Sequence, residues 1–157
     1  MGIEQGEFAM SRERSESEIL RRVAEQHVML QQLMRRIEEV LEKRLGTVDQ
    51  VADMIAELGD RLVKHFTLEE EGGYFSEALR FSPQLVSRAN DLLAQHPRMA
   101  GRVRQISVQI GAGAGPGDWW AETATRLKAF KAELHRHERG EDSLIQEAYH
   151  QDLGAND

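Results

Sequence analysis

The sequence predicts an all-α protein, specifically an antiparallel up-down-up-down four-helix bundle. Along four long segments, apolar residues recur at alternating steps of three and four, which is the spacing of one face of an amphipathic helix. No segment of any length shows the strict alternation of apolar and polar residues that is typical of a strand. Glycines separate the four segments, at Gly46, at Gly72-Gly73 and in the run Gly111–Gly117.

The first helix is expected to begin at Ser15 or Ser17, because a serine side chain can accept a hydrogen bond from the first turn. The polar residues 1–14 before it are expected to form a flexible segment, and Gly46 ends the helix. Its core-facing positions are Leu20, Val23, His27, Leu30, Met34, Ile37 and Leu41.

The second helix is expected to begin after Thr47, a good N-cap residue, and to stop at Gly72-Gly73. The short connection around Gly46 makes the first two helices antiparallel neighbours. The core-facing positions of the second helix are Val48, Val51, Ile55, Leu58, Leu62, His65 and Glu69.

The third helix is expected to start at Pro83, since proline fits the first turn of a helix. Pro97 lies inside this helix and removes a backbone hydrogen bond, so we expect a kink there or a restart near His96. The core-facing positions are Leu85, Ala89, Leu92, His96, Met99, Val103, Ile106 and Ile110.

The fourth helix follows the glycine-rich linker, and Asp118 is its expected N-cap. The bundle is expected to span residues 15–150, with a tail at residues 151–157. The core-facing positions of the fourth helix are Trp120, Thr123, Leu127, Phe130, Leu134, His137, Glu141, Leu144 and Ala148.

The composition of the chain excludes several classes of function. Its 157 residues suit one domain, and a net charge of −7 without any basic, aromatic-rich stretch argues against binding to nucleic acid. No apolar run approaches the roughly 20 residues that cross a bilayer, and no signal peptide is evident, so we expect a cytoplasmic protein with no membrane partner. With no cysteine, any metal must be held by nitrogen and oxygen.

Six polar residues occupy positions of the helices that should face the core. Burying an unpaired carboxylate costs on the order of several kcal/mol, so their presence in one core requires a common explanation. Each helix contributes one histidine, and in two helices a glutamate follows four residues later. The six residues are His27, His65, Glu69, His96, His137 and Glu141.

Counting along the helices places the four histidines near one level of the bundle. His27 lies about 19 residues before Gly46 and His65 about 19 after it, at a rise of roughly 1.5 Å per residue. His96 and His137 lie about 18 and about 23 residues from the middle of the glycine linker, which is level to within roughly two turns. Residues i and i+4 share a helix face, so each histidine–glutamate pair can present a nitrogen and an oxygen together.

Imidazoles and carboxylates without thiolates make iron, manganese and zinc the candidate metals, and the histidine-rich set favours iron or zinc over magnesium or calcium. The two carboxylates could bridge a pair of metal ions, with the imidazoles as terminal ligands. A single core histidine is more often a hydrogen-bonded core residue than a ligand, but recurrence in all four helices favours ligation. His135 and His150 are interpreted as solvent-facing or incidental. Asp142 is left open as a ligand, an acceptor for an imidazole N–H or a surface residue.

The order and spacing of these residues resemble the hemerythrin-like HHE cation-binding domain family. The resemblance covers nearly the whole chain, from about Ser17 to Tyr149. It implies a four-helix bundle with a non-haem, usually di-iron, site that binds dioxygen or a related diatomic molecule. It also implies four histidines as terminal ligands and two bridging glutamates around two iron ions or one, with zinc or manganese ranked behind iron. The segments that carry it are Glu-Gln-His27, His65-Phe-Thr-Leu-Glu69, Gln-His96-Pro and His137-Glu-Arg-Gly-Glu141-Asp142.

The sequence departs from the oxygen-carrying hemerythrins of invertebrates at two positions. Their third helix has His-x-x-x-His, whereas here the second of these positions is Ala100. Their last helix has an aspartate five residues after its histidine, which corresponds to Asp142 rather than Glu141. The departures imply two unequal metal positions, or a single metal ion. They favour sensing, or redox chemistry with peroxide or nitric oxide, over simple oxygen carriage.

Three functions are therefore considered. The first is a metal-binding protein that binds dioxygen or another diatomic molecule at a di-iron centre and is not itself an enzyme. The second is a non-haem di-iron oxidoreductase that acts on peroxide or nitric oxide at an open metal position. The third is a structural helical bundle that holds no metal, and in that case replacing His65 or Glu69 should not weaken the fold.

Overall fold

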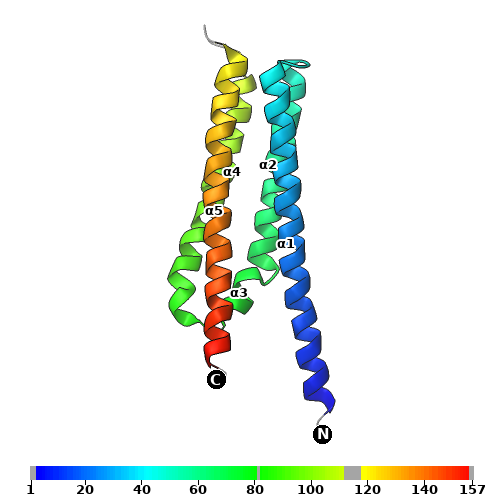
Figure 1. Ribbon diagram of the computed structural model, residues 1–157. Helices are drawn as coiled ribbons and strands as arrows, with labels where there is room; N and C mark the ends of the chain where they lie inside the picture. Colours follow the sequence, from blue (N-terminus) through cyan, green and yellow to red (C-terminus); the bar gives the residue numbers. More distant parts are fainter. Residues whose placement is uncertain (1–2, 81, 112–117, 156–157) are drawn as a thin grey trace.

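The computed structural model describes residues 3–80, 82–111 and 118–155, and all regular structure in these ranges is helical. The long helices α1, α2, α4 and α5 run side by side, and α3 and the 3₁₀ helix η1 connect α2 to α4 (Figure 1). Each long helix packs against the next one along the chain, and α5 packs against α1, which closes the bundle. The predicted antiparallel four-helix bundle is confirmed. The elements are α1 Ile3–Lys43, α2 Val48–Glu71, α3 Tyr74–Leu79, η1 Pro83–Leu85, α4 Val86–Gly111 and α5 Trp119–Ala155.

The two ends of the chain are more helical than the sequence patterns suggested. The expected start of the first helix at Ser15 or Ser17 is wrong, because α1 already begins at Ile3. Residues 3–14 contain Glu, Ala, Met and Arg but no proline, so a helix stabilised by the bundle can extend backwards through them. The first turns of α1 project beyond the other helices (Figure 1). At the other end α5 continues to Ala155, into the expected tail.

The predicted helix caps are confirmed where α2 and α5 begin. Thr47 and Gln50 form a reciprocal capping box, with the Gln50 N–H donating to Thr47 Oγ1 at 3.2 Å and the Thr47 N–H donating to Gln50 Oε1 at 3.0 Å. Asp118 Oδ1 accepts hydrogen bonds from the backbone N–H groups of Trp120 and Ala121 at 3.1 and 3.3 Å. The expected glycine linker lies outside the described residues, apart from Gly111 at the end of α4.

The chain turns sharply directly after α2, as the two glycines predicted. Gly72 closes the C-terminus of α2, with its N–H donating to the Leu68 carbonyl oxygen at 2.8 Å. Gly73 has a φ of 87°, in the left-handed region that glycine adopts without a steric penalty. The expectations for the two prolines need correction. Pro83 begins η1 rather than α4, and α4 runs as one helix through Pro97. The expected restart near His96 is therefore wrong, and the alternative of a kink at Pro97 stays a prediction.

The core consists of two apolar clusters at different levels of the bundle. The larger one contains Leu30, Leu62, Met99 and Leu134, and the smaller one contains residues such as Leu144. On α1, α4 and α5 the predicted polar core residues fall between these clusters in sequence. On α2, His65 lies between Leu62 and Phe66 of the larger cluster, and Glu69 follows them. The apolar clusters therefore enclose one polar layer. The smaller cluster consists of Val23, Tyr74, Phe75, Leu85, Ala89, Leu92, Leu144, Ile145 and Ala148.

Most of the predicted core-facing positions are buried, with few exceptions. Val48 is 41% exposed because it is the first residue of α2, outside the packed part of the bundle. Leu20, His27 and Trp120 are partly buried. The patterns missed several buried residues that lie beside the main helical stripes or in the connection after α2, namely Leu33, Phe66, Tyr74, Phe75 and Ile145. None of the helices in the described ranges has an apolar stretch that could cross a membrane.

The turn after α2 gives a first prediction, because it sets the path of the chain directly after Glu69. Replacing Gly73 by alanine should lower the free energy of unfolding by about 1–2 kcal/mol, since a Cβ is disfavoured at positive φ. Gly101→Ala in α4 is the matched control, because a Cβ there meets nothing within 4 Å, and it should stabilise by about 0.5–1 kcal/mol. Urea unfolding of both variants measures the difference, and equal effects would contradict the assignment.

Candidate metal centre

The structure gathers all six predicted side chains into two adjoining groups of potential metal ligands. The first group contains Glu69, His96, His137 and Glu141, and the second contains His27, His65 and Glu69. Within each group the ligand atoms lie within 4.8 Å of one another. Glu69 belongs to both groups, so the two possible metal positions are neighbours.

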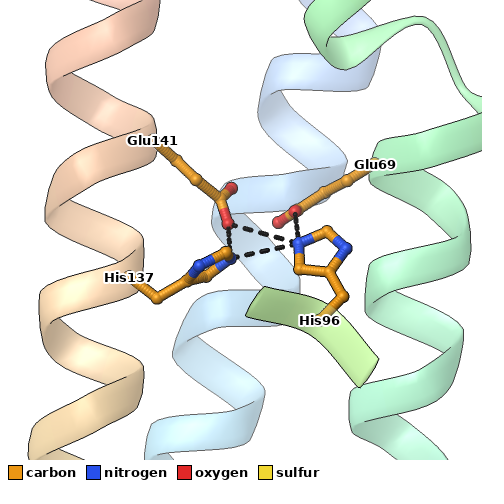
Figure 2. A group of neighbouring side chains, drawn as sticks. All are labelled: Glu69, His96, His137 and Glu141. Atoms are coloured by element: carbon orange, nitrogen blue, oxygen red, sulfur yellow. Dashed lines mark hydrogen bonds and ion pairs between the residues drawn. The ribbon is translucent and has the colours of Figure 1, made fainter. Parts of the chain in front are cut away.

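In the first group, two imidazoles and two carboxylates from three helices point toward one another (Figure 2). The Nε2 atoms of His96 and His137 are 3.1 Å apart. His96 Nε2 lies 3.2 Å from Glu69 Oε2 and 3.8 Å from Glu141 Oε1. His137 Nε2 is in close contact with Glu141 Oε1, four residues later on α5, as the helical spacing predicted.

The second group joins α1 to α2 and uses the other oxygen of the shared carboxylate. His27 Nε2 and His65 Nε2 are 3.0 Å apart. Glu69 Oε1 lies 2.5 Å from His65 Nε2 and 3.6 Å from His27 Nε2. Glu69 Oε1 therefore faces His27 and His65, whereas Oε2 faces His96, an arrangement that suits a carboxylate between two cations.

Outer hydrogen bonds fix the orientation of three of the four imidazoles. His65 Nδ1 donates to Gln26 Oε1 at 2.8 Å, and His137 Nδ1 donates to Gln95 Oε1 at 2.9 Å. His96 Nδ1 donates to Glu70 Oε1 at 2.9 Å. Amide and carboxylate oxygens can only accept, so the outer ring nitrogen carries a proton.

The inner Nε2 of each of these rings is then available to bind a metal ion. This is how metal-binding histidines are usually held. The site residues predicted from the sequence did not include Glu70, Gln26 or Gln95. The signal for the two glutamines was their position directly before His27 and His96.

An aromatic ring closes one side of the polar layer. Phe66 stacks on His96 with ring centroids 3.9 Å apart and an interplanar angle of 5°. It also meets the edges of the His65 and His137 rings, at 5.9 and 5.8 Å between centroids. Phe66 thus keeps water away from three imidazoles and restricts their rotation. The side chain of His27 is 13% exposed, whereas those of the other three histidines are 1–3% exposed.

The carboxylates of the layer are buried without the hydrogen bonds that such groups require. Both oxygens of Glu69 and both of Glu141 are inaccessible to water and have no hydrogen-bond partner among the residues that the structure describes, although imidazole nitrogens lie within ion-pair distance. The nitrogens and oxygens converge on common points and are not aligned as hydrogen-bonded pairs. Buried unpaired carboxylates are costly, and a cation at those points would satisfy them. The residues therefore fit a metal.

The pKa shifts have the same electrostatic origin. Burial raises the pKa of Glu69, but the facing imidazoles, beginning with that of His27, outweigh burial and hold the pKa well below its usual range. Burial lowers the pKa of His96, but the carboxylates around it, beginning with Glu141, raise it to about 10. Burial likewise lowers the pKa of His27, and Glu69 and Glu138 reverse the shift. In the metal-free chain a proton on His96 thus supplies positive charge beside the buried carboxylates.

Two further residues near the layer were not predicted. Glu138 on α5 is only 6% exposed, and burial raises the pKa of its carboxyl group. Tyr74 at the start of α3 is 5% exposed, and burial raises its pKa, with further contributions from Glu141 and Glu69. Glu138 lies three residues before Glu141 and four after Leu134, and this spacing places it on a buried face of α5.

The remaining candidates lie outside both groups of ligands. Asp142 is exposed, as is His150, and His135 is partly buried. Ala100, where a further histidine was considered, is partly buried on α4 one turn after His96. The first group nevertheless offers four ligand residues, and the second offers three.

Residues 18–149 match the hemerythrin HHE cation binding domain, and this range contains all six residues of the two groups. The chain belongs to this family. Comparison with curated proteins and with solved structures gives no match. As a hemerythrin-like domain, the protein is a cation-binding bundle, and its histidine–glutamate clusters are the potential metal site.

The proton on His96 gives a second prediction. Its pKa of about 10 lies above the ordinary value of 6.5, so the imidazole is charged at neutral pH, and a metal must displace that proton. Metal binding should therefore release protons, and each displaced proton should raise the affinity about tenfold per pH unit between neutral pH and about 10. Calorimetry in buffers of different ionisation enthalpy measures the release, and binding without it would contradict the predicted charge.

A rise in pH should lower the stability of the metal-free chain, whereas it should raise the affinity for metal. In the metal-free chain the raised pKa means that protonated His96 stabilises the fold fully below pH 6.5, and this contribution is lost as the pH rises through about 10. Loading with metal should remove this loss.

The outer hydrogen bonds give a third prediction. Gln95→Met removes the acceptor for His137 Nδ1 while keeping the size of the side chain, and it should weaken metal binding by about 10–100-fold. Gln105→Met, at an exposed position of the same helix, is the matched control and should leave the affinity unchanged. Titration with a divalent metal distinguishes the two, and equal affinities would show that Gln95 does not hold the imidazole.

Proposed function

We propose that the protein holds two iron ions at this centre and binds dioxygen or a related diatomic molecule, for sensing, storage or iron handling. The observation that carries the proposal is the position of Glu69. Its Oε1 lies beside His27 and His65, whereas its Oε2 lies beside His96. One carboxylate shared in this way supports a pair of metal ions better than a single ion.

The proposed ligands divide between two metal positions. His96 and His137 would be terminal ligands of one ion, and His27 and His65 of the other, with Glu69 as the bridge. Glu141 approaches only the first pair in this structure, at His96 and His137, so its role as a second bridge requires a small movement toward His27. Bound iron would supply the redox and ligand-binding chemistry, while the chain orients the imidazoles and excludes water through Phe66.

The donor set supports iron as the metal. Imidazole nitrogens with carboxylate oxygens suit iron, zinc and manganese, and no thiolate is present to favour a softer ion. Reactivity with a diatomic molecule requires a redox-active metal, which favours iron over zinc.

A surface hollow of about 290 Å³ lies between α1 and α2, and Gln26 is one of the residues that line it. Because Gln26 accepts the hydrogen bond from His65, solvent approaches the His65 side of the centre.

The fourth prediction tests the number of ions and the bridge. The protein loaded with ferrous iron without oxygen should hold two ions per chain, and Glu69→Gln should reduce this to less than one, because both positions use that carboxylate. Elemental analysis after gel filtration measures the count, and exposure to air should change the visible absorption of the wild-type protein.

Asp142→Asn is the matched control, since this carboxylate is exposed beside Glu141, and it should retain two ions. A wild-type protein that holds no iron would overturn the proposal, and one ion per chain would overturn the dinuclear site. Two ions with no spectral response to dioxygen or nitric oxide would leave iron handling as the function.

A di-iron oxidoreductase is the second candidate, favoured by the unequal number of ligands in the two groups. The group of His27 and His65 has three ligand residues, and an ion held there would keep open positions for a substrate. Peroxide and nitric oxide are the substrates to assay with the iron-loaded protein. Multiple turnovers would establish an enzyme, whereas reversible binding without turnover would favour the first function.

A further inference from the structure

Glu138 is a buried carboxylate that the proposed set of metal ligands does not use. It is 6% exposed, and its Oε1 is inaccessible to water and has no hydrogen-bond partner among the described residues. Glutamate is almost never buried to this extent without a partner. A buried, unsatisfied acceptor that costs stability requires an explanation in the function of the site.

The position of Glu138 directs it to one side of the centre. It lies on α5 three residues before Glu141, and α5 packs against α1. Burial raises the pKa of its carboxyl group, and imidazoles partly offset the rise, most strongly that of His27, followed by those of His135 and His65. Two of these three belong to the same potential metal position.

That position is also the one with fewer ligands. The group of His96 and His137 has two imidazoles and two carboxylates, whereas the group of His27 and His65 has two imidazoles and only Glu69. Glu138 is outside both groups as the chain stands without metal. Its flexible side chain can rotate toward a cation that would satisfy the unpaired oxygen.

We propose that Glu138 is a further metal ligand, specific to the position formed by His27, His65 and Glu69. With it, both positions have two imidazoles and two carboxylates from the protein. The inference rests on the proposed two-metal centre and adds a residue to one half of it. It also implies that Glu138 occupies a coordination site that an external ligand would otherwise take.

The test uses cobalt(II), which binds imidazole and carboxylate ligands and reports its coordination in its visible spectrum. His96→Ala leaves the position of His27 and His65 as the intact one, and His27→Ala leaves the other. Adding Glu138→Gln should weaken cobalt binding about tenfold or more in the His96→Ala protein and change the spectrum. In the His27→Ala protein the same substitution should change neither.

Glu147→Gln serves as the control on the same helix, since Glu147 pairs with Arg88 at the surface, and it should have no effect in either background. Equal affinities with and without Glu138→Gln in the His96→Ala protein would overturn the proposal. A loss in the His27→Ala protein alone would also overturn it, because Glu138 would then serve the other ion.

Unfolding provides a measurement in the otherwise unaltered chain. Glutamine has the shape of glutamate but no charge, so metal-free Glu138→Gln should melt no lower than the wild-type protein, and cobalt should raise its melting temperature by less. An equal rise with cobalt would contradict a ligand role. If wild-type protein binds no cobalt or iron, the two-metal centre itself fails. If wild-type and Glu138→Gln proteins both bind two ions with equal affinity, only this inference fails.

Discussion

The burial of Glu69 among three imidazoles is the constraint on which the rest of the structure depends. Its carboxylate is completely enclosed, with one oxygen beside histidines of α1 and α2 and the other beside a histidine of α4. Such a group is tolerated only with positive charge beside it, whether from protons on the imidazoles or from metal ions. The four long helices must then stay in register, because each one contributes a histidine to the same layer. A shift of one helix by a turn would leave a buried charge without compensation.

The two apolar clusters make this register possible. They lie on either side of the polar layer, so the energy that drives helix packing comes from apolar residues and not from the ligands themselves. The bundle can therefore fold around a centre that contributes little stability while it lacks metal. Binding of a cation to the folded state alone then shifts the folding equilibrium in its favour. Phe66 connects the apolar core to the polar layer, because it packs in the larger cluster and stacks on His96.

The sequence allowed the bundle and the polar layer to be predicted because both follow from helical periodicity. His65 and Glu69 are one turn apart, so their common face follows from geometry alone, as it does for His137 and Glu141. Glu138 was missed because it directly follows a core histidine, beside the main stripe of core-facing positions. Its spacing from Leu134 and Glu141 was the signal that could have identified it as buried. The start of α1 at Ile3 was also missed. No strong cap or breaker marks the start of this helix, and its first turns project beyond the other helices (Figure 1).

The two halves of the centre have unequal numbers of ligands, as the sequence suggested. The half with fewer ligands is, however, not the one that the sequence indicated. The alanine at position 100 pointed to a weaker site at His96, yet that site has two carboxylates close to its imidazoles. The site of His27 and His65 has one carboxylate in its group, and His27 is the most exposed of the four histidines. Fewer protein ligands and greater exposure coincide there, which are the conditions for an external molecule to reach a metal. Glu138 is buried, and the imidazole of His27 lowers the pKa of its carboxyl group against the effect of burial, so the ligand proposed for this half would compete with such a molecule.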